Sequence, residues 1–243
     1  MITAAAVCPA PPLLARELTG ADPVVPDLRQ ACLEATRALL ATGPALVAVV
    51  GVAGESRAFD PRGRADLAAY APALARQQDG HDGPPARPAG EPLPLSLGLG
   101  SRLLDEAGYA GRRELRSVSE QTPAADCAAL GAGLAGLAAR VGLLVMADGS
   151  ARRGLRAPGY LDERSAPFDA GVERAVRDGD MTALLALDPA LASELMATGR
   201  AAWQVLAGAM SGSRPAGQIR YSGDPFGVAY LVAVLTAAAD GST

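Results

Sequence analysis

Lysine is absent from this chain, histidine occurs once and cysteine occurs three times. The cysteines, Cys8, Cys32 and Cys127, lie far apart and are odd in number, which excludes a disulfide framework and a zinc-type spacing. The single histidine, His81, cannot supply the two imidazoles of a typical non-haem iron site. Aromatic residues make up 4% of the chain, so small aliphatic side chains must build the core.

Long apolar runs and basic clusters are also missing. No stretch approaches the about 18 apolar residues of a membrane span, and no basic region precedes the apolar start. The 22 basic and 26 acidic residues give a net charge of −4 without a basic stripe. We therefore expect a cytoplasmic protein with neither a membrane nor a nucleic acid as partner.

The apolar periodicity predicts strands that alternate with helices. The predicted strands are Ile2–Val7, Leu46–Val52, Arg113–Val118, Leu143–Ala147, Gln218–Tyr221 and Val228–Leu235. The predicted helices are Asp27–Leu40, Leu97–Ala107, 122–140, Phe168–Arg177, Thr182–Leu187, Pro189–Met196 and Ala201–Met210, with a surface loop over Gly80–Pro94. This order predicts an α/β fold, a single-domain α/β sandwich over residues 1–243 with a largely parallel central sheet flanked by helices. We expect an antiparallel element near the C-terminus and a disordered tail at 238–243.

The stretch Val141–Arg153 is the first place to look for a site. Its apolar part predicts a buried strand, which is followed by the loop Asp148-Gly149-Ser150. Ligands of open α/β sheets bind at such strand ends. Asp148 either caps amides of its own loop or acts as an acid or base. Arg152, Arg153 and Arg156 either bind an anion or form a solvated loop.

Three further patterns favour packing over chemistry. Gly131-x-Gly133-x-x-Gly136 matches the dinucleotide fingerprint as a string, but it lies inside a predicted helix, where glycines permit close packing. A reactive thiolate needs a base nearby, and the sequence offers none for Cys8, so we expect Cys8 to be a small packing residue. Ser150 has no partner histidine unless the loop of His81 reaches it.

Several segments together resemble the B-type subunit of the class III extradiol ring-cleavage dioxygenase family, in the branch common in actinobacteria. They are CPAPPLL (Cys8–Leu14), VVGVAGE (Val49–Glu55), MADGSARR (Met146–Arg153), APGYLDERSAPFD (Ala157–Asp169), TGRAAWQVLAGAM (Thr198–Met210) and DPFGVAYLVA (Asp224–Ala233). The resemblance spans almost the whole chain and implies a single α/β domain with its site at strand ends.

In catalytic members the resemblance implies ferrous iron held by two histidines and one glutamate, with a further histidine as acid or base. The corresponding positions here are Ala10, the neighbourhood of Ala53, and Ala151 in the Asp148-Gly149-Ser150-Ala151 pattern. The glutamate would fall near 198–200, and the nearest carboxylate, Glu194, is out of register. Alanine has no lone pair for a metal and no proton to transfer.

Our leading hypothesis is a non-catalytic relative (a pseudoenzyme) or a metal-independent protein that uses the same cleft, with no cofactor. One alternative is an active dioxygenase of a catechol-type substrate with non-standard ligands or a partner subunit. Another is a module for a small acid or peptide, with Arg152 or Arg200 as anchor. A small-molecule ligand in the cleft and homo-oligomer formation remain expectations. Asp148 and Ser150 are the catalytic candidates, and the cleft positions are Cys8, Ala10, Ala53, Glu55, Asp148, Ala151, Arg152 and Arg200.

Overall fold

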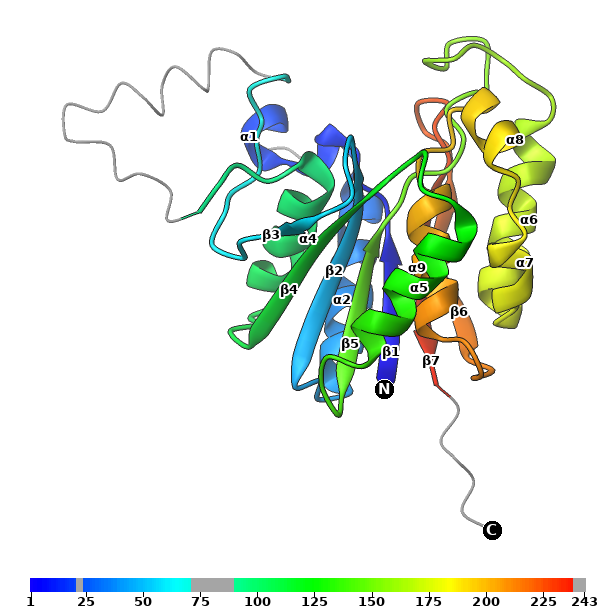
Figure 1. The fold of residues 1–243 in the computed structure, drawn as a ribbon. Coiled ribbons are helices and arrows are strands. Elements are labelled where there is room, and N and C mark those ends of the chain that lie inside the picture. Colours follow the sequence, from blue (N-terminus) through cyan, green and yellow to red (C-terminus); the bar gives the residue numbers. More distant parts are fainter. Residues whose placement is uncertain (21–23, 71–89, 238–243) are drawn as a thin grey trace, which may run out of the picture.

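A seven-stranded mixed sheet runs through the computed structural model, which describes residues 1–20, 24–70 and 90–237 (Figure 1). The strand order is β3-β4-β2-β5-β1-β7-β6. The strands are β1 (Ile2–Cys8), β2 (Leu46–Ala53), β3 (Ala58–Phe59), β4 (Arg112–Ser119), β5 (Val141–Met146), β6 (Ala216–Gly223) and β7 (Tyr230–Thr236). His81 and the tail 238–243 lie outside the described residues.

The middle of the sheet is parallel and both edges are antiparallel. Strand β5 pairs in parallel with β1 and β2, and β2 pairs in parallel with β4. At the edges, β7 runs antiparallel to β1 and β6, and β3 runs antiparallel to β4. The predicted α/β class and the antiparallel C-terminal element are therefore confirmed, and the carboxyl ends of β1, β2, β4 and β5 meet at one edge.

Helices cover both faces of the sheet, as Figure 1 shows with α2 behind it and α5 and α9 in front. The rear face packs on α2 (Pro26–Ala41) and α4 (Leu95–Glu106). The front face packs on the other long helices through a core that includes Trp203. These helices are α5 (Ala124–Ala135), α6 (Ser165–Asp178) and α9 (Arg200–Ala209), and the short α7 (Met181–Leu185) and α8 (Pro189–Glu194) lie between α6 and α9 in the chain. Side chains alternate between these two cores along each central strand, as the pleat requires.

Two helix boundaries differ from the prediction by three residues or more. Helix α5 ends at Ala135, with Gly136 as its C-cap, and does not reach residue 140. Thr122 does not cap this helix, because its hydroxyl bonds the Ser56 hydroxyl at 2.9 Å. Helix α6 begins at Ser165, three residues early, since a proline within the first turn, Pro167, costs no helical hydrogen bond.

Three short elements were not predicted: the 3-10 turn η1 (Pro12–Leu14), helix α1 (Arg16–Thr19) and strand β3. Each is too short to show an apolar period, so its sequence carries no periodic signal. The first two follow β1 in the chain, and Pro12 of η1 lines the site described below.

One glycine of the α5 string, Gly131, serves helix packing as predicted. A Cβ atom on Gly131 would lie 2.1 Å from the carbonyl oxygen of Val205, and one on Gly208 would lie 2.3 Å from that of Ala128. The backbones of α5 and α9 therefore approach too closely for a side chain at either position. Gly133, by contrast, has nothing within 4 Å.

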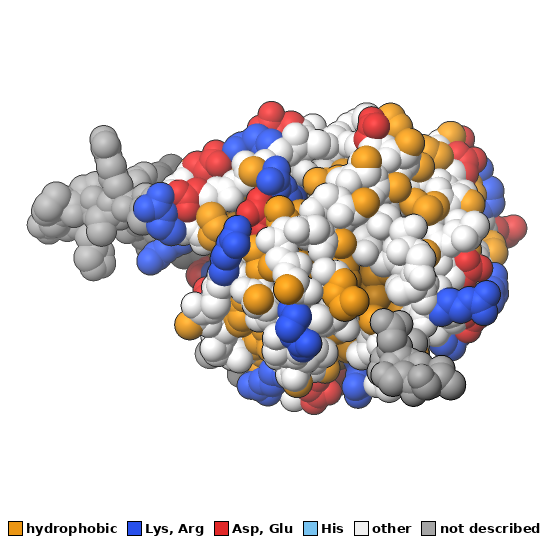
Figure 2. Space-filling view, turned by 60° about the horizontal axis from the view of Figure 1, so that its bottom comes forward, with side chains coloured by type: hydrophobic (Ala, Val, Ile, Leu, Met, Phe, Trp, Pro, Cys, Tyr) orange, Lys and Arg blue, Asp and Glu red, His pale blue; other side chains and the backbone are white. Residues whose placement is uncertain are grey.

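The face toward the lower end of Figure 1 is shown in Figure 2. Apolar side chains and backbone occupy its middle, and arginine and acidic side chains are interspersed mainly around its edge. This distribution shows no single cationic stripe on that face. Within the described ranges, no helix has the length and apolar character needed to cross a membrane.

Candidate functional site

A cavity of about 520 Å³ lies where the carboxyl ends of β1, β2, β4 and β5 meet, and we call it the Asp148 cavity. It is lined by Ala10, Pro12, Val52, Ala53, Gly54, Tyr70, Pro94, Leu95, Ser96, Glu120, Met146, Asp148 and Thr198. Its position agrees with the rule that open α/β sheets bind ligands at strand ends. Three of the predicted cleft positions, Ala10, Ala53 and Asp148, thus line one space.

Asp148 follows β5 and holds the loop after β1 in place. The backbone N–H of Ala10 donates to Asp148 Oδ1 at 2.8 Å. Burial raises the pKa of Asp148 to about 6, although this hydrogen bond acts in the opposite direction. The amide that Asp148 binds belongs to the loop after β1 and not to its own loop. An acid or base role, with which the raised pKa is consistent, stays a prediction.

Sequence reasoning missed Glu120, Ser96 and Thr198, which also line the cavity. Glu120 directly follows β4, so the strand-end argument applied to Asp148 would also have found it. Ser96 lies in the first turn of α4 and donates its hydroxyl to the carbonyl oxygen of Val52 at 2.8 Å. The described lining therefore offers two carboxylates and several hydroxyl groups, and contains no arginine.

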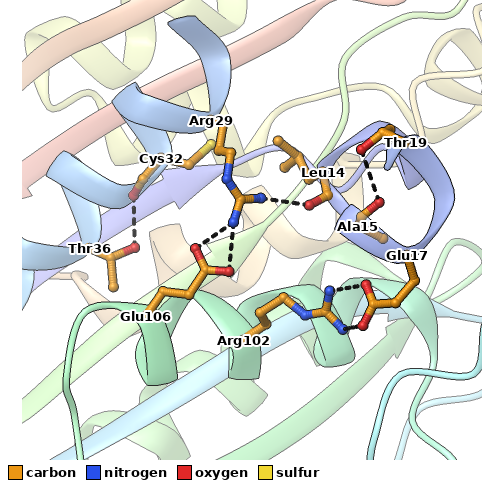
Figure 3. Close-up of polar contacts among 9 residues, drawn as sticks. All are labelled: Leu14, Ala15, Glu17, Thr19, Arg29, Cys32, Thr36, Arg102 and Glu106. Atoms are coloured by element: carbon orange, nitrogen blue, oxygen red, sulfur yellow. Dashed lines mark hydrogen bonds and ion pairs between the residues drawn. The ribbon is translucent and has the colours of Figure 1, made fainter. Parts of the chain in front are cut away.

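Ion pairs brace the wall formed by the segment after β1, as Figure 3 shows. Arg29 of α2 donates to the carbonyl oxygen of Leu14 at 2.8 Å and pairs with Glu106 of α4 at 2.6 Å. Arg102 of α4 pairs with Glu17 of α1, and this hydrogen-bonded pairing lowers the pKa of Glu17. The wall that carries Ala10 and Pro12 is thereby fixed to both rear helices.

Cys8 and Glu55 do not line the Asp148 cavity. Cys8 is fully buried in the rear core, and its thiol points to the carbonyl oxygen of Cys32 at 3.9 Å, as expected for a packing residue. Hydrogen bonding with the Cys8 thiol, together with burial, raises the pKa of Cys32. Glu55 is exposed and pairs with Arg57 at 2.6 Å.

Ser150 and Ala151 do not line this cavity. The Ser150 hydroxyl donates to Asp169 Oδ2 at 2.6 Å, and its backbone N–H donates to Asp169 Oδ1 at 3.0 Å. Ala151 donates its N–H to the carbonyl oxygen of Leu195. Ser150 therefore fixes its loop to α6 outside the Asp148 cavity, and a catalytic role for it stays a prediction.

Arg152 and Arg200, the candidate ligand anchors, donate to groups of the chain itself, and their anchor role stays a prediction. Arg152 donates to the carbonyl oxygens of Gly159 and Glu194 at 2.7 and 2.9 Å. Arg200 is 3% exposed and donates to the Thr122 carbonyl oxygen at 2.8 Å and to Gln204 Oε1 at 2.7 Å. Both guanidinium groups hold loops together and do not line the Asp148 cavity.

The donor set does not fit the iron site that the resemblance implies. Such a site takes two imidazoles and one carboxylate, whereas Ala10 and Ala53 present methyl groups to the cavity. Across residues 1–20, 24–70 and 90–237, no cluster of three His, Cys, Asp or Glu side chains is placed to hold a metal ion. His81 lies outside these ranges, so the absence of a cofactor stays a prediction.

Comparison with solved structures identifies a distant match to an uncharacterized protein from Escherichia coli. The two chains share 15% sequence identity with a TM-score of 0.57, over 96% of this chain and 99% of the other. At this identity the likeness concerns the fold alone. No protein-family model matches the chain, and neither does any curated protein sequence.

Proposed function

We propose that this chain is a metal-independent binding protein whose small-molecule ligand occupies the Asp148 cavity. One observation carries the proposal: Ala10, Ala53 and Asp148, from three strand ends, line a single cavity. A pocket of about 520 Å³ is within the range of small-molecule sites. The resemblance to extradiol dioxygenases supports this proposal, because it implies a strand-end pocket in which alanines replace the iron ligands.

The charge of the cavity restricts the ligand. Asp148 and Glu120 accept hydrogen bonds, and the described lining contains no arginine to receive an anion. This argues against a small acid and favours a neutral or cationic molecule with adjacent donor groups. A catechol-type diol, the substrate class that the resemblance implies, provides two such donors.

Thermal unfolding in the presence of chelator tests the binding. A ligand that binds the folded state alone raises the midpoint by mass action, so we expect catechol to raise it and benzoate to leave it unchanged. Asp148→Asn retains an acceptor but removes the negative charge, and should reduce the shift. An equal shift with both compounds, or with wild type and variant, would refute the assignment to this cavity.

The alternative of an active dioxygenase makes a different prediction in the same samples. Anaerobic loading with ferrous iron, followed by oxygen and catechol, would then give a ring-cleavage product. We expect no product, because the described cavity lacks the imidazole donors. Product formation that is abolished by removing the iron would favour the alternative.

A further inference from the structure

Most of the exposed large apolar side chains lie in one region, which we call the Leu155 patch. Within the described ranges nine large hydrophobic side chains are exposed, and five of them belong to this patch. They are Leu155, Tyr160, Leu161, Met196 and Phe226, each 42–65% exposed. Single exposed apolar residues are ordinary on a protein surface, whereas a concentration of them marks an interaction site.

Contacts between segments bring the patch together near α8, at one end of the molecule in Figure 1. A Cβ atom on Gly159 would lie 2.6 Å from Met196 Sδ. The backbone N–H of Arg153 donates to the carbonyl oxygen of Gly227 at 3.0 Å. The loop 153–161 therefore contacts both the residues after α8 and the turn between β6 and β7. None of the five patch side chains lines the Asp148 cavity, so the patch is a separate surface.

Two residues of the patch hold a backbone conformation that is unfavourable for a side chain. Among the described non-glycine residues, Tyr160 and Met196 alone have a positive φ, at 60° and 55°. In this left-handed region a Cβ atom crowds the neighbouring carbonyl oxygen, so glycine is the usual residue. Strain of this kind is concentrated where a surface has a function. Here it keeps two large apolar side chains exposed at positions that glycine would occupy more easily.

The charged residues beside the patch leave one cation and one anion over. The others are paired within the chain: Arg152 and Arg164 with Asp162, Arg164 also with Glu194, and Arg153 with Asp224. Arg156 and Glu163 are exposed, and neither side chain has an ion-pair or hydrogen-bond partner among the described residues. A twofold axis brings such a pair opposite the same pair of a second copy, with the charges complementary.

We propose that the Leu155 patch is the contact surface between two copies of this chain, in a twofold-symmetric dimer in which Arg156 of each copy meets Glu163 of the other. A standard interface buries about 800 Å² on each partner, and five half-exposed large side chains with their polar rim are on that scale. An anionic membrane or a nucleic acid needs a cationic surface, whereas this rim has one unpaired cation against one unpaired anion among the described residues. The proposal does not depend on the function of the Asp148 cavity.

Sedimentation equilibrium of the full chain tests the association. We expect a monomer–dimer equilibrium that shifts with protein concentration. Leu155→Ser removes the most exposed apolar side chain of the patch and should weaken the dimer about tenfold. Leu137→Ser changes an exposed leucine that follows α5, outside the patch, and should leave the dimer unchanged.

Charge reversal tests the twofold arrangement. Arg156→Glu places like charges opposite each other across the axis and should weaken the dimer about tenfold, and Glu163→Arg should do the same. The double variant restores opposite charges and should return the dissociation constant to within about threefold of wild type. Additive losses in the double variant would show that these two residues do not meet.

Three results would overturn the proposal. The first is a single monomeric species at every soluble concentration. The second is a dimer that Leu155→Ser and both single reversals leave unchanged, since its contact surface would then lie elsewhere. The third is a monomeric chain that cosediments with phosphatidylglycerol vesicles, which would assign the patch to a membrane surface. Thermal melts establish that each variant is folded.

Discussion

A carboxyl group at the end of a buried strand, without a cation beside it, keeps its proton to higher pH than in water. Asp148 is such a group, and burial raises its pKa to about 6. Its unfolded value is about 3.9. The folded chain therefore binds more protons than the unfolded chain between these two values, and its free energy of unfolding falls as pH rises through that window.

Asp148→Asn should remove this dependence. The free energy of unfolding of the variant minus that of wild type should rise by roughly 1–3 kcal/mol as the pH is raised from 4 to 7. Urea unfolding at several pH values measures the difference, in which the titration of other groups cancels. The exposed carboxylate variant Asp178→Asn is the control. A difference between Asp148→Asn and wild type that stays constant with pH would contradict the account.

Arg200 is a candidate ligand anchor that holds a loop in the structure. It is buried and bonds the loop between β4 and α5 through the carbonyl oxygen of Thr122. Arg200→Ala should lower the free energy of unfolding by about 2–4 kcal/mol, because buried hydrogen-bond acceptors lose their donor. Arg164→Ala breaks surface pairs with Asp162 and Glu194 and should lower the free energy of unfolding far less. Equal unfolding midpoints in urea for the two variants would show that Arg200 is not a structural tie.

At the scale of elements, the close contact between α5 and α9 involves backbone atoms of both helices. The glycine pattern of α5 matches a nucleotide-binding string, but the strand that such a motif requires does not directly precede it. The predicted helix around the string favours the packing interpretation, and the contact of Gly131 with the backbone of Val205 confirms it for that glycine alone.

Two glycines of α5, two residues apart, test this contact. Gly131→Ala places a Cβ against the backbone of α9 and should cost about 1–3 kcal/mol. Gly133→Ala meets nothing within 4 Å and should gain about 0.5–1 kcal/mol from helix propensity. Thermal or urea unfolding of both variants measures the contrast. Stabilisation by both substitutions would contradict the close helix contact.

The regular elements could be predicted from sequence because apolar residues repeat with a helical or strand period. Boundaries were less predictable where a tertiary contact decides them. Thr122 is a residue type that often caps helices, yet its hydroxyl is hydrogen-bonded to the hydroxyl of Ser56 instead. The two-residue β3 exists through its pairing with β4, and no local sequence signal marks such a strand.

At the scale of the molecule, the strand-end rule located the site and did not determine which side chains face it. Ala10, Ala53 and Asp148 line the cavity as expected, whereas Ser150 turns to Asp169 on α6. Residues one or two positions apart in a loop diverge because the backbone conformation sets their direction. Glu120 was missed because the strand-end rule was applied to β5 and not to β4, which ends at the same edge.

The structural likeness to the Escherichia coli protein extends over nearly both chains and supports a common fold. It does not bear on chemistry, since fold does not imply function. The chemical argument rests on the side chains of the Asp148 cavity, two carboxylates beside two alanines.

Iron content after anaerobic loading and desalting tests the central claim most directly. The full chain is mixed with ferrous iron, desalted and analysed for metal, beside an Asp148→Ala variant treated identically. The account predicts that wild type retains no more iron than the variant, while catechol still stabilises wild type in chelator. One iron per wild-type chain, lost in the variant, would contradict it.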